Sequence, residues 1–266
     1  MATALIGGML ARGSAATDLR VVEPLAAARD ALAARHPGIA LHAECNDDAV
    51  AGAELVVLAV KPQQMRVAAE TLASCLGDRA APVVLSIAAG IRLVDLSRWL
   101  RGRGHLVRAM PNTPALIGKG ISGVFAAPAV DAAGRALVAK VLEAAGEQIW
   151  VDDETLLDAV TGVSGSGPAY VFYFLEALEE AARELGFAPS DARRLAFSTF
   201  AGAIALAQSS SLEPALLRAQ VTSKGGTTER GIATLEAGAV KEKIVAAARA
   251  AARRSGELGD AFGRDT

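Results

Sequence analysis

The first 151 residues alternate short apolar runs with longer segments rich in alanine and leucine. The run Leu55–Val60 is apolar throughout, a pattern typical of a parallel strand that is covered on both faces. Alternating strands and helices with short connections predict a doubly wound α/β sheet. The expected strands are Leu19–Glu23, Ile39–Ala43, Leu55–Val60, Val83–Ile87, Leu106–Met110, Gly123–Ala126 and Gln148–Val151, and the expected helices between them are Leu25–Ala34, Gln64–Leu76, Leu93–Leu100 and Ala132–Ala145.

The pattern changes near Asp152, after which no strand-like alternation occurs. Pro168 opens a segment whose apolar residues recur at steps of three and four, and Gly186 closes it, as expected for one helix. We therefore expect two domains, an α/β domain over residues 1–152 and an all-helical domain over residues 153–266. The further helices expected in the second domain are Ser190–Gln208, Leu212–Val221, Thr228–Glu236 and one from Val240 to about Arg254.

The segment Ser190–Gln208 is apolar around most of its circumference. Such a helix is buried, either in its own core or against a second copy of the chain. About 110 residues make a small core for a separate domain, so a homodimer built on these helices is the favoured interpretation.

The chain begins with a helix rather than a strand, because Met1–Ala11 is helical in pattern and Gly13 caps its end. A dinucleotide-binding unit opens with a strand and a glycine-rich turn before its first helix, and that strand is central in the sheet. We therefore expect a Rossmann-like parallel sheet whose first strand is missing, with the true start upstream. The alternative is that this helix is the first element of another α/β fold.

The overall charge is close to balanced, with 27 Lys and Arg against 29 Asp and Glu. This balance gives no electrostatic reason to expect a nucleic-acid partner or an anionic membrane surface. No apolar stretch approaches the roughly 20 residues that a membrane-spanning helix needs. Nothing at the start has the pattern of a signal peptide, and two cysteines are too few for a disulfide scaffold, so we expect a cytoplasmic protein.

The histidines and cysteines exclude two classes of site. His36, His42 and His105 are not spaced as metal ligands, so we expect no metal. The stretch Gly162–Ser166 resembles a hydrolase nucleophile turn, but serine replaces its closing glycine and no histidine follows position 105. A hydrolase is therefore not expected.

Three strand ends carry compact loops that outline one crevice, because ligands of α/β sheets bind at the carboxyl ends of strands. Lys61 lies at the first end, where it faces solvent, or a phosphate or ribose of a ligand. Ser86–Gly90 at the second end contains small residues that allow a flat ring to approach. Met110–Ala115 at the third end contains two prolines, which predict a rigid turn.

Two glycine-rich segments, Thr161–Pro168 and Thr222–Thr228, are expected to be loops that run directly into predicted helices of the second half. Backbone N–H groups at a helix start form an anion site, although glycine, serine and threonine there can also serve only as turns and caps. Two such segments in one small domain favour a site for a compact carboxylate.

These motifs together resemble the pyrroline-5-carboxylate reductase family, and the likeness is collinear over nearly the whole chain. The two stretches Ser-Gly-Ser-Gly-Pro-Ala-Tyr and Lys-Gly-Gly-Thr-Thr carry most of its specificity. The segments that match are Met1–Gly13, Ala59–Pro62, Met110–Pro114, Asp158–Tyr170 and Val221–Thr228. The family opens with a strand and a glycine-rich turn just before the residue that matches Met1, so the chain departs from it where the pyrophosphate would bind.

The resemblance implies reduction of 1-pyrroline-5-carboxylate to L-proline with NADPH or NADH, the last step of proline biosynthesis. It implies a Rossmann domain, an α-helical dimerisation domain and a homodimer, often assembled into a decamer. The implied cofactor contacts are Asn46, Ala59, Val60, Lys61, Pro62, Ala88, Ala89 and Gln220, the last replacing a different amide of other members. The implied substrate contacts are Glu154, Gly225, Gly226, Thr227 and Thr228.

The chemistry expected from these residues is mainly positioning. A helix start that holds the substrate carboxylate would orient the imine for hydride transfer, and the Thr228 hydroxyl would act as the catalytic hydrogen-bonding group at the ring nitrogen. No histidine or cysteine is placed as an acid, so the proton comes from solvent or with the substrate. Glu23, at the end of the expected strand Leu19–Glu23, favours NADH because a carboxylate repels a 2′-phosphate.

Two alternatives stay open. The first is a related imine or 2-hydroxyacid reductase on the same plan, although the lysine that hydroxyacid enzymes use has no match in Lys224, Lys241 or Lys243. The second is a non-catalytic oligomeric homologue that lacks the phosphate-binding loop.

Overall fold

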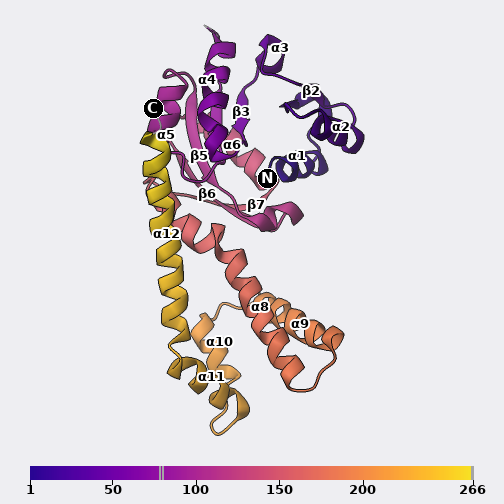
Figure 1. Cartoon of the computed structure of the whole chain (residues 1–266), viewed down its shortest axis with the longest axis vertical. Helices are drawn as coiled ribbons and strands as arrows, with labels where there is room; N and C mark the ends of the chain where they lie inside the picture. Colours follow the sequence, from indigo (N-terminus) through magenta and orange to yellow (C-terminus); the bar gives the residue numbers. More distant parts are fainter. Residues whose placement is uncertain (78, 80, 265–266) are drawn as a thin grey trace. The chain divides into compact units, whose positions relative to one another are not determined.

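The computed structural model in Figure 1 describes residues 1–77, 79 and 81–264. The chain divides into two compact units. Unit 1 comprises Met1–Gly165 together with the chain from Ala250 onward, and unit 2 comprises Ser166–Arg249. The division at residues 152 and 153 expected from sequence differs from this grouping, because the next 13 residues and the end of the last helix pack with the sheet.

Unit 1 is an α/β unit whose helices follow the strands in the predicted order. Its strands are β1 (Arg20–Val22), β2 (Ala40–His42), β3 (Leu55–Leu58), β4 (Val83–Ser86), β5 (His105–Met110), β6 (Gly120–Ala126) and β7 (Gly146–Trp150). Its helices are α1 (Ala2–Ala11), α2 (Ala26–Arg35), α3 (Asp47–Val50), α4 (Met65–Leu76), α5 (Leu93–Trp99), α6 (Ala132–Glu143) and α7 (Leu156–Val160).

The strands form two sheets. Strands β3 to β7 make one sheet in that order, and β1 pairs with β2 in a second sheet. Within the described residues no strand joins β1 to β3, which is the position that the sequence pattern left open. The pairs are parallel except β5 with β6, which is antiparallel. The Rossmann-like class is therefore confirmed, but the sheet is not all parallel as expected: β6 and β7 run opposite to β3, β4 and β5.

The five-stranded sheet is covered on both faces, as the apolar runs predicted (Figure 1). Alternate residues of β4 enter opposite cores: Leu85 packs with α1 and α6, and Val84 packs with α4 and α5. Neither side chain retains exposed surface. Burying an aliphatic side chain of this size contributes about 1.5–3 kcal/mol, so these two layers stabilise unit 1.

Helix α1 lies very close to the end of α6, and glycine makes that approach possible. A Cβ atom added to Gly8 would lie 2.2 Å from the Ala144 carbonyl oxygen. Any side chain at position 8 would therefore push α1 away from the sheet. The N-terminal helix expected from the sequence is thus confirmed as an integral layer of unit 1.

Unit 2 consists of helices. They are α8 (Gly167–Glu184), α9 (Pro189–Gln208), α10 (Pro214–Gln220), α11 (Thr227–Ala237) and the first part of α12 (Val240–Arg264). Helices α8 and α9 pack against each other through buried residues that include Leu175 and Ala192. The last helix is ten residues longer than predicted, because the expected end at Arg254 lies inside α12.

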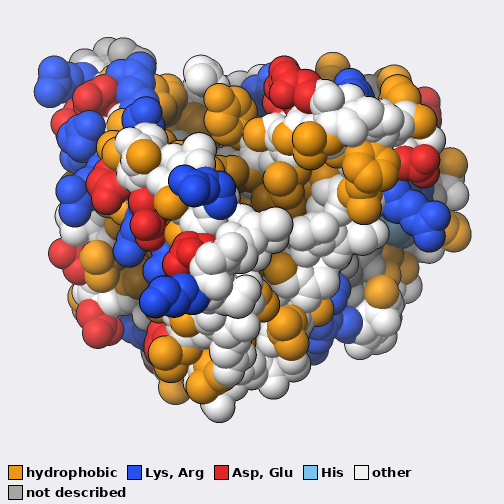
Figure 2. Space-filling view, turned by 90° about the horizontal axis from the view of Figure 1, so that it is seen from below, with side chains coloured by type: hydrophobic (Ala, Val, Ile, Leu, Met, Phe, Trp, Pro, Cys, Tyr) orange, Lys and Arg blue, Asp and Glu red, His pale blue; other side chains and the backbone are white. Residues whose placement is uncertain are grey.

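Unit 2 leaves many large apolar side chains in contact with solvent. Phe172, Tyr173 and Ile204 are 57%, 72% and 58% exposed. Figure 2 shows hydrophobic side chains exposed among polar and charged ones on one face of the molecule. An isolated helical unit would not leave such residues uncovered, so this surface suits contact with another protein surface.

Candidate active site

The register of the parallel strands places three loops at one edge of the sheet. Leu58 pairs with Ser86, and Ser86 pairs with Arg108, so β3, β4 and β5 end side by side. The segments that follow are Ala59–Pro62, Ile87–Gly90 and Pro111–Asn112. The structure therefore brings together six of the predicted cofactor residues: Ala59, Val60, Lys61, Pro62, Ala88 and Ala89.

The loop after β4 is compact and buried. Ser86 has no exposed surface, its Oγ lies 3.5 Å from the Ala88 backbone nitrogen, and the Ala88 side chain is 5% exposed. Gly90 closes the loop with φ of +75°, in the left-handed region that glycine adopts without a steric cost. The loop thus presents backbone and small side chains at the carboxyl edge, a surface that fits a flat ring.

Glu23 and Asn46 follow β1 and β2, the two strands of the smaller sheet. The backbone N–H of Leu25 donates to Glu23 Oε1 at 2.9 Å, and the backbone N–H of Ala49 donates to Asn46 Oδ1 at 2.9 Å. Asn46 thereby caps α3, a short helix that the sequence pattern did not predict. Arg29 donates to the carbonyl oxygens of Glu23 and Pro24 at 2.7 and 2.8 Å, which holds this strand end in place.

A buried charge cluster lies behind the end of β5. Arg108 is 4% exposed in its side chain, and its Nη1 lies 3.0 Å from Glu154 Oε1. Its Nη2 lies 3.8 Å from Asp158 Oδ1. The Leu93 backbone N–H, at the start of α5, donates to the same Glu154 oxygen at 2.9 Å. Both Glu154 contacts use Oε1. Through them, Glu154, in the segment before α7, is linked to β5 and to the start of α5.

The first glycine-rich segment is helical rather than a loop, which corrects the expectation for residues 161–168. Thr161–Gly165 forms a π-helical turn that continues α7, and α8 begins at Gly167. The Thr161 hydroxyl donates to the Leu157 carbonyl at 2.8 Å, and Asn112 Nδ2 donates to Ser164 Oγ at 3.2 Å. These contacts tie the turn to the loop after β5, so the segment supplies packing and not an open row of N–H groups.

The second glycine-rich segment is a turn at the start of α11, as predicted. Gly225 has φ of +73°, and Gly226 is the N-cap of a helix that begins at Thr227. Glu229 Oε2 accepts a hydrogen bond from the Gly225 N–H at 2.6 Å. Its carboxylate therefore occupies part of the anion site, in the manner of an acidic residue in the first helical turn that caps the helix. Thr228 is half-buried in that turn, and Gln220 is the last, exposed residue of α10.

Sequence reasoning missed Arg108, Asp158 and Ser255 as members of a site. Ser255, on α12, donates to Asp158 Oδ1 at 2.7 Å across 97 residues of sequence. One signal was available, because Arg108 interrupts an otherwise apolar strand and a buried arginine requires a carboxylate partner. The identity of that partner depends on contacts far apart in the chain.

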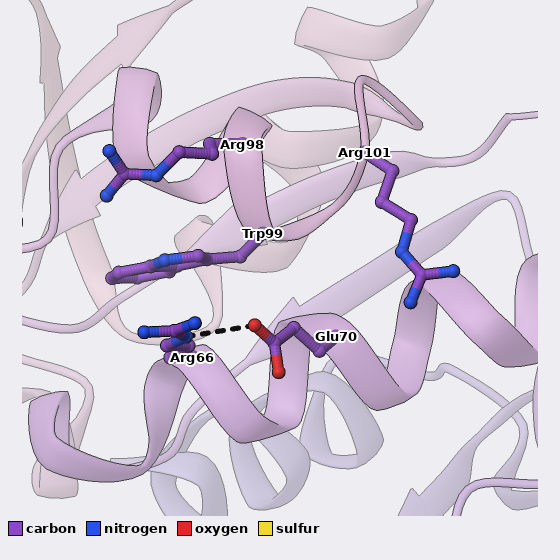
Figure 3. Close-up of a pocket in the computed structure, with 5 residues that line it drawn as sticks. All are labelled: Arg66, Glu70, Arg98, Trp99 and Arg101. Atoms are coloured by element: carbon purple, nitrogen blue, oxygen red, sulfur yellow. Dashed lines mark hydrogen bonds and ion pairs between the residues drawn. The ribbon is translucent and has the colours of Figure 1, made fainter. Parts of the chain in front are cut away.

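A separate cavity of about 210 Å³ lies between α4 and α5. Figure 3 shows the Trp99 ring edge-on between the guanidinium groups of Arg98 and Arg66, with Glu70 paired to Arg66 at 2.9 Å. None of its lining residues is a candidate site residue, and the cavity therefore adds nothing to the crevice at the strand ends.

The described residues hold no group of three or more histidine, cysteine or acidic side chains that could bind a metal ion. None of the described helices combines the length and apolar character needed to cross a lipid bilayer.

The sequence of this chain is similar to those of known proteins over both of its halves. A sequence model described as pyrroline-5-carboxylate reductase dimerisation matches residues 154–258, and one described as NADP oxidoreductase, coenzyme F420-dependent, matches residues 1–90. A pyrroline-5-carboxylate reductase of Pseudomonas aeruginosa is 42% identical over 264 residues, covering 99% of this chain and 95% of the relative.

Solved structures agree with these matches. A pyrroline-5-carboxylate reductase of Coxiella burnetii superposes with a TM-score of 0.90 at 35% identity, covering 97% of this chain and 94% of that one. A Plasmodium falciparum pyrroline carboxylate reductase with NADP bound shares the fold, with a TM-score of 0.83 at 24% identity and coverage of 97% and 94%. The fold, the order of the sequence motifs and the relatives that match over nearly their whole length all agree. The chain therefore belongs to the pyrroline-5-carboxylate reductase family of NAD(P)-dependent oxidoreductases.

Proposed function

We propose that this chain reduces 1-pyrroline-5-carboxylate to L-proline with NADH or NADPH, using the residues named below. The observation that carries the proposal is the Gly225–Thr228 turn at the start of α11, where a small carboxylate would meet backbone N–H groups and the positive end of a helix. Family membership supplies the reaction, and this turn supplies the chemistry that recognises the acid.

The residues at the strand ends suit a nicotinamide dinucleotide in size and charge. Ala88 and Ala89 leave room for the nicotinamide ring, Lys61 is an exposed cation for the phosphates, and Glu23 accepts from a ribose hydroxyl. Asn46, Ala59, Val60, Pro62 and Gln220 are the other proposed contacts. When bound, the cofactor would supply the hydride for the imine carbon.

The protein contributes positioning rather than a dedicated acid. Gly225, Gly226 and Thr227 orient the substrate carboxylate, and the Thr228 hydroxyl oxygen accepts a hydrogen bond from the protonated ring nitrogen. Glu154 offers its second oxygen, because both of its contacts within the described residues use Oε1. Holding the reacting groups in one geometry lowers the entropic part of the barrier.

Self-association follows from the dimerisation region and the exposed apolar helices of unit 2. We propose a homodimer formed through residues 153–266, with residues 1–152 as the cofactor domain, and a decamer as the larger assembly. We also propose a cytoplasmic location, which is consistent with the two free cysteines, Cys45 and Cys75. We propose neither a nucleic-acid nor a membrane partner.

The proposal is tested with the purified chain, synthetic 1-pyrroline-5-carboxylate and each cofactor. Loss of NAD(P)H absorbance must depend on the imine, and mass spectrometry must identify L-proline. Thr228→Ala is expected to lower kcat about tenfold or more, since a hydrogen bond to a charged group contributes about 1.5–3 kcal/mol. Thr228→Ser keeps the hydroxyl and serves as the control.

Three results would contradict the proposal in different ways. A folded chain without imine-dependent oxidation would favour the non-catalytic homologue. Oxidation with another imine or a 2-hydroxyacid, and none with 1-pyrroline-5-carboxylate, would favour the related reductase. Equal kinetics of Thr228→Ala and the unmodified chain would remove Thr228 from catalysis alone.

A further inference from the structure

The last turns of α12 pack against the loop that follows β4. Gly259 is buried, and a Cβ atom added there would lie 3.2 Å from both the Gly90 carbonyl oxygen and Arg92 Nε. A Cβ added to Gly90 would in turn lie 3.3 Å from the Phe262 ring. The backbones of Gly90 and Gly259 approach each other here, and the side chains of Arg92 and Phe262 line the same contact.

Polar contacts hold the helix end to the same region. Arg92 Nη1 lies 2.7 Å from Asp260 Oδ1, and Arg98 Nη2 donates to the Gly263 carbonyl at 2.9 Å. Ser255, which is 4% exposed, donates to Asp158 in the Arg108 cluster at 2.7 Å. All of these residues belong to unit 1, so the end of α12 is a layer of the α/β unit although it is last in sequence.

We propose that the end of α12 positions the Ala88–Gly90 loop for the cofactor, with Gly259 as the positioning residue. This inference rests on the proposed assignment of Ala88 and Ala89 to the nicotinamide. The loop cannot retreat from α12 without moving these two residues, because Gly90 follows them directly. A displacement of a few tenths of an ångström there changes the fit of a bound ring and leaves the Thr228 turn unaffected.

Glycine is otherwise an unfavourable choice at this point in a helix. It costs about 1 kcal/mol relative to alanine in a helix interior, so alanine at position 259 would stabilise α12 if only helix formation mattered. The close approach to the Gly90 carbonyl explains the glycine. One turn earlier, a Cβ on Gly256 would meet Asp158 Oδ2 at 3.5 Å, an ordinary contact.

The test compares Gly259→Ala with the matched control Gly256→Ala in the full-length chain. We expect Gly259→Ala to raise the Kd for NAD(P)H, measured by fluorescence titration, and the KM for the cofactor by about threefold or more. The KM for the imine and kcat at saturating cofactor should stay within about twofold. Amide hydrogen exchange of residues 86–92 in the free protein should be faster than in the control.

A second pair of variants keeps the inference testable if Gly259→Ala does not fold. Asp260→Asn removes the ion pair with Arg92, whereas Glu257→Gln removes only an exposed pair with Arg254 in the same helix. Faster exchange of residues 86–92 and weaker cofactor binding in Asp260→Asn alone would support the inference.

The inference would be overturned if Gly259→Ala had the same cofactor Kd and the same amide hydrogen exchange of residues 86–92 as its control. If Gly259→Ala does not fold, the same comparison applies to Asp260→Asn and its control. The proposed function would stand in either case. A uniform rise in both KM values and a lower kcat would mark a general loss of structure and would also overturn the inference. If the unmodified chain neither binds NAD(P)H nor turns over, the proposed function fails first and this inference with it.

Discussion

Arg108 Nη1 lies 3.0 Å from Glu154 Oε1, with the arginine side chain almost fully buried in β5. One cation here contacts two carboxylates, since Asp158 Oδ1 lies 3.8 Å from its Nη2. The contact joins the central sheet to the segment where the helical part of the chain begins, and through the Leu93 N–H it also fixes the start of α5.

Removing the arginine should leave two uncompensated carboxylates in a buried site. We expect Arg108→Met to lower the free energy of unfolding by about 3–5 kcal/mol, measured by urea denaturation. Glu154→Gln should cost less, because the amide oxygen still accepts from Leu93 N and Arg108.

The control for this prediction is Arg254→Met, which removes an exposed pair with Glu257. We expect its unfolding free energy to stay within about 0.5 kcal/mol of the unmodified chain. Equal losses in Arg108→Met and Arg254→Met would show that the buried cluster does not contribute to stability.

Glu229 competes for the anion site that the substrate is proposed to use, because its carboxylate accepts from the Gly225 N–H at 2.6 Å. Glu229→Ala frees this donor and removes a negative charge from the start of α11. We expect the KM for 1-pyrroline-5-carboxylate to fall about two- to fivefold, the equivalent of about 0.3–1 kcal/mol at a helix start. Steady-state kinetics at saturating cofactor measure this change.

Glu236→Ala provides the comparison, since Glu236 lies near the other end of α11 and pairs with Arg218 at 3.5 Å. Its KM should not change. A higher KM in Glu229→Ala would mean that Glu229 supports the turn more than it competes with the substrate.

We expect Glu23 to discriminate between cofactors, because its carboxylate follows β1 and accepts a hydrogen bond from the Leu25 N–H at 2.9 Å. A 2′-phosphate beside it would meet like charge, so we expect a higher kcat/KM with NADH than with NADPH. Glu23→Gln should lower the NADH to NADPH ratio about fivefold or more, from a repulsion of about 1 kcal/mol or more at 4 Å.

Initial rates at matched cofactor concentrations test this prediction. Asp30→Asn, which neutralises an exposed acid on α2, should leave the ratio unchanged. A preference for NADPH in the unmodified chain would show that Glu23 does not face the ribose.

Burial, together with the neighbouring Cys75, raises the pKa of the Cys45 thiol to about 12. At pH 8 only about one thiol in ten thousand would then be ionised, against roughly one in ten for a cysteine with the ordinary pKa of 9.0. We expect iodoacetamide to alkylate Cys45 very slowly in the folded protein and about tenfold faster for each unit of pH up to about 11. Peptide mass spectrometry measures the rate.

The raised pKa of Cys45 also makes the stability of the folded state depend on pH. The unfolded chain ionises this thiol near its ordinary value of 9.0, so the folded state loses stability as the pH rises above about 9. Alkylation in urea provides the reference rate. Equal rates in folded and unfolded protein at pH 8 would contradict the raised pKa.

Most elements were predictable because each depends on spacing within a few residues. The apolar run Leu55–Val60 contains β3, and the segment opened by Pro168 and closed by Gly186 contains α8. The turn at Gly225 and Gly226 was equally local, since positive φ and a helix start need only glycine and its neighbours. Thr161–Gly165 failed as a predicted loop because its neighbour α7 and the Asn112 contact hold it in a helical turn.

The chain's local pattern thus sufficed for the succession of strands and helices, for the compact loop that ends at Gly90 and the turn at Gly225, and for the family. Tertiary contacts alone set the reversed direction of β6, the partners of Arg108 and the packing of α12 on the Gly90 loop. Backbone preference acts between near neighbours, whereas a buried charge or a close backbone approach takes its partner from wherever packing brings one. Asp158 finds Ser255 across 97 residues, a distance over which no periodic pattern carries information.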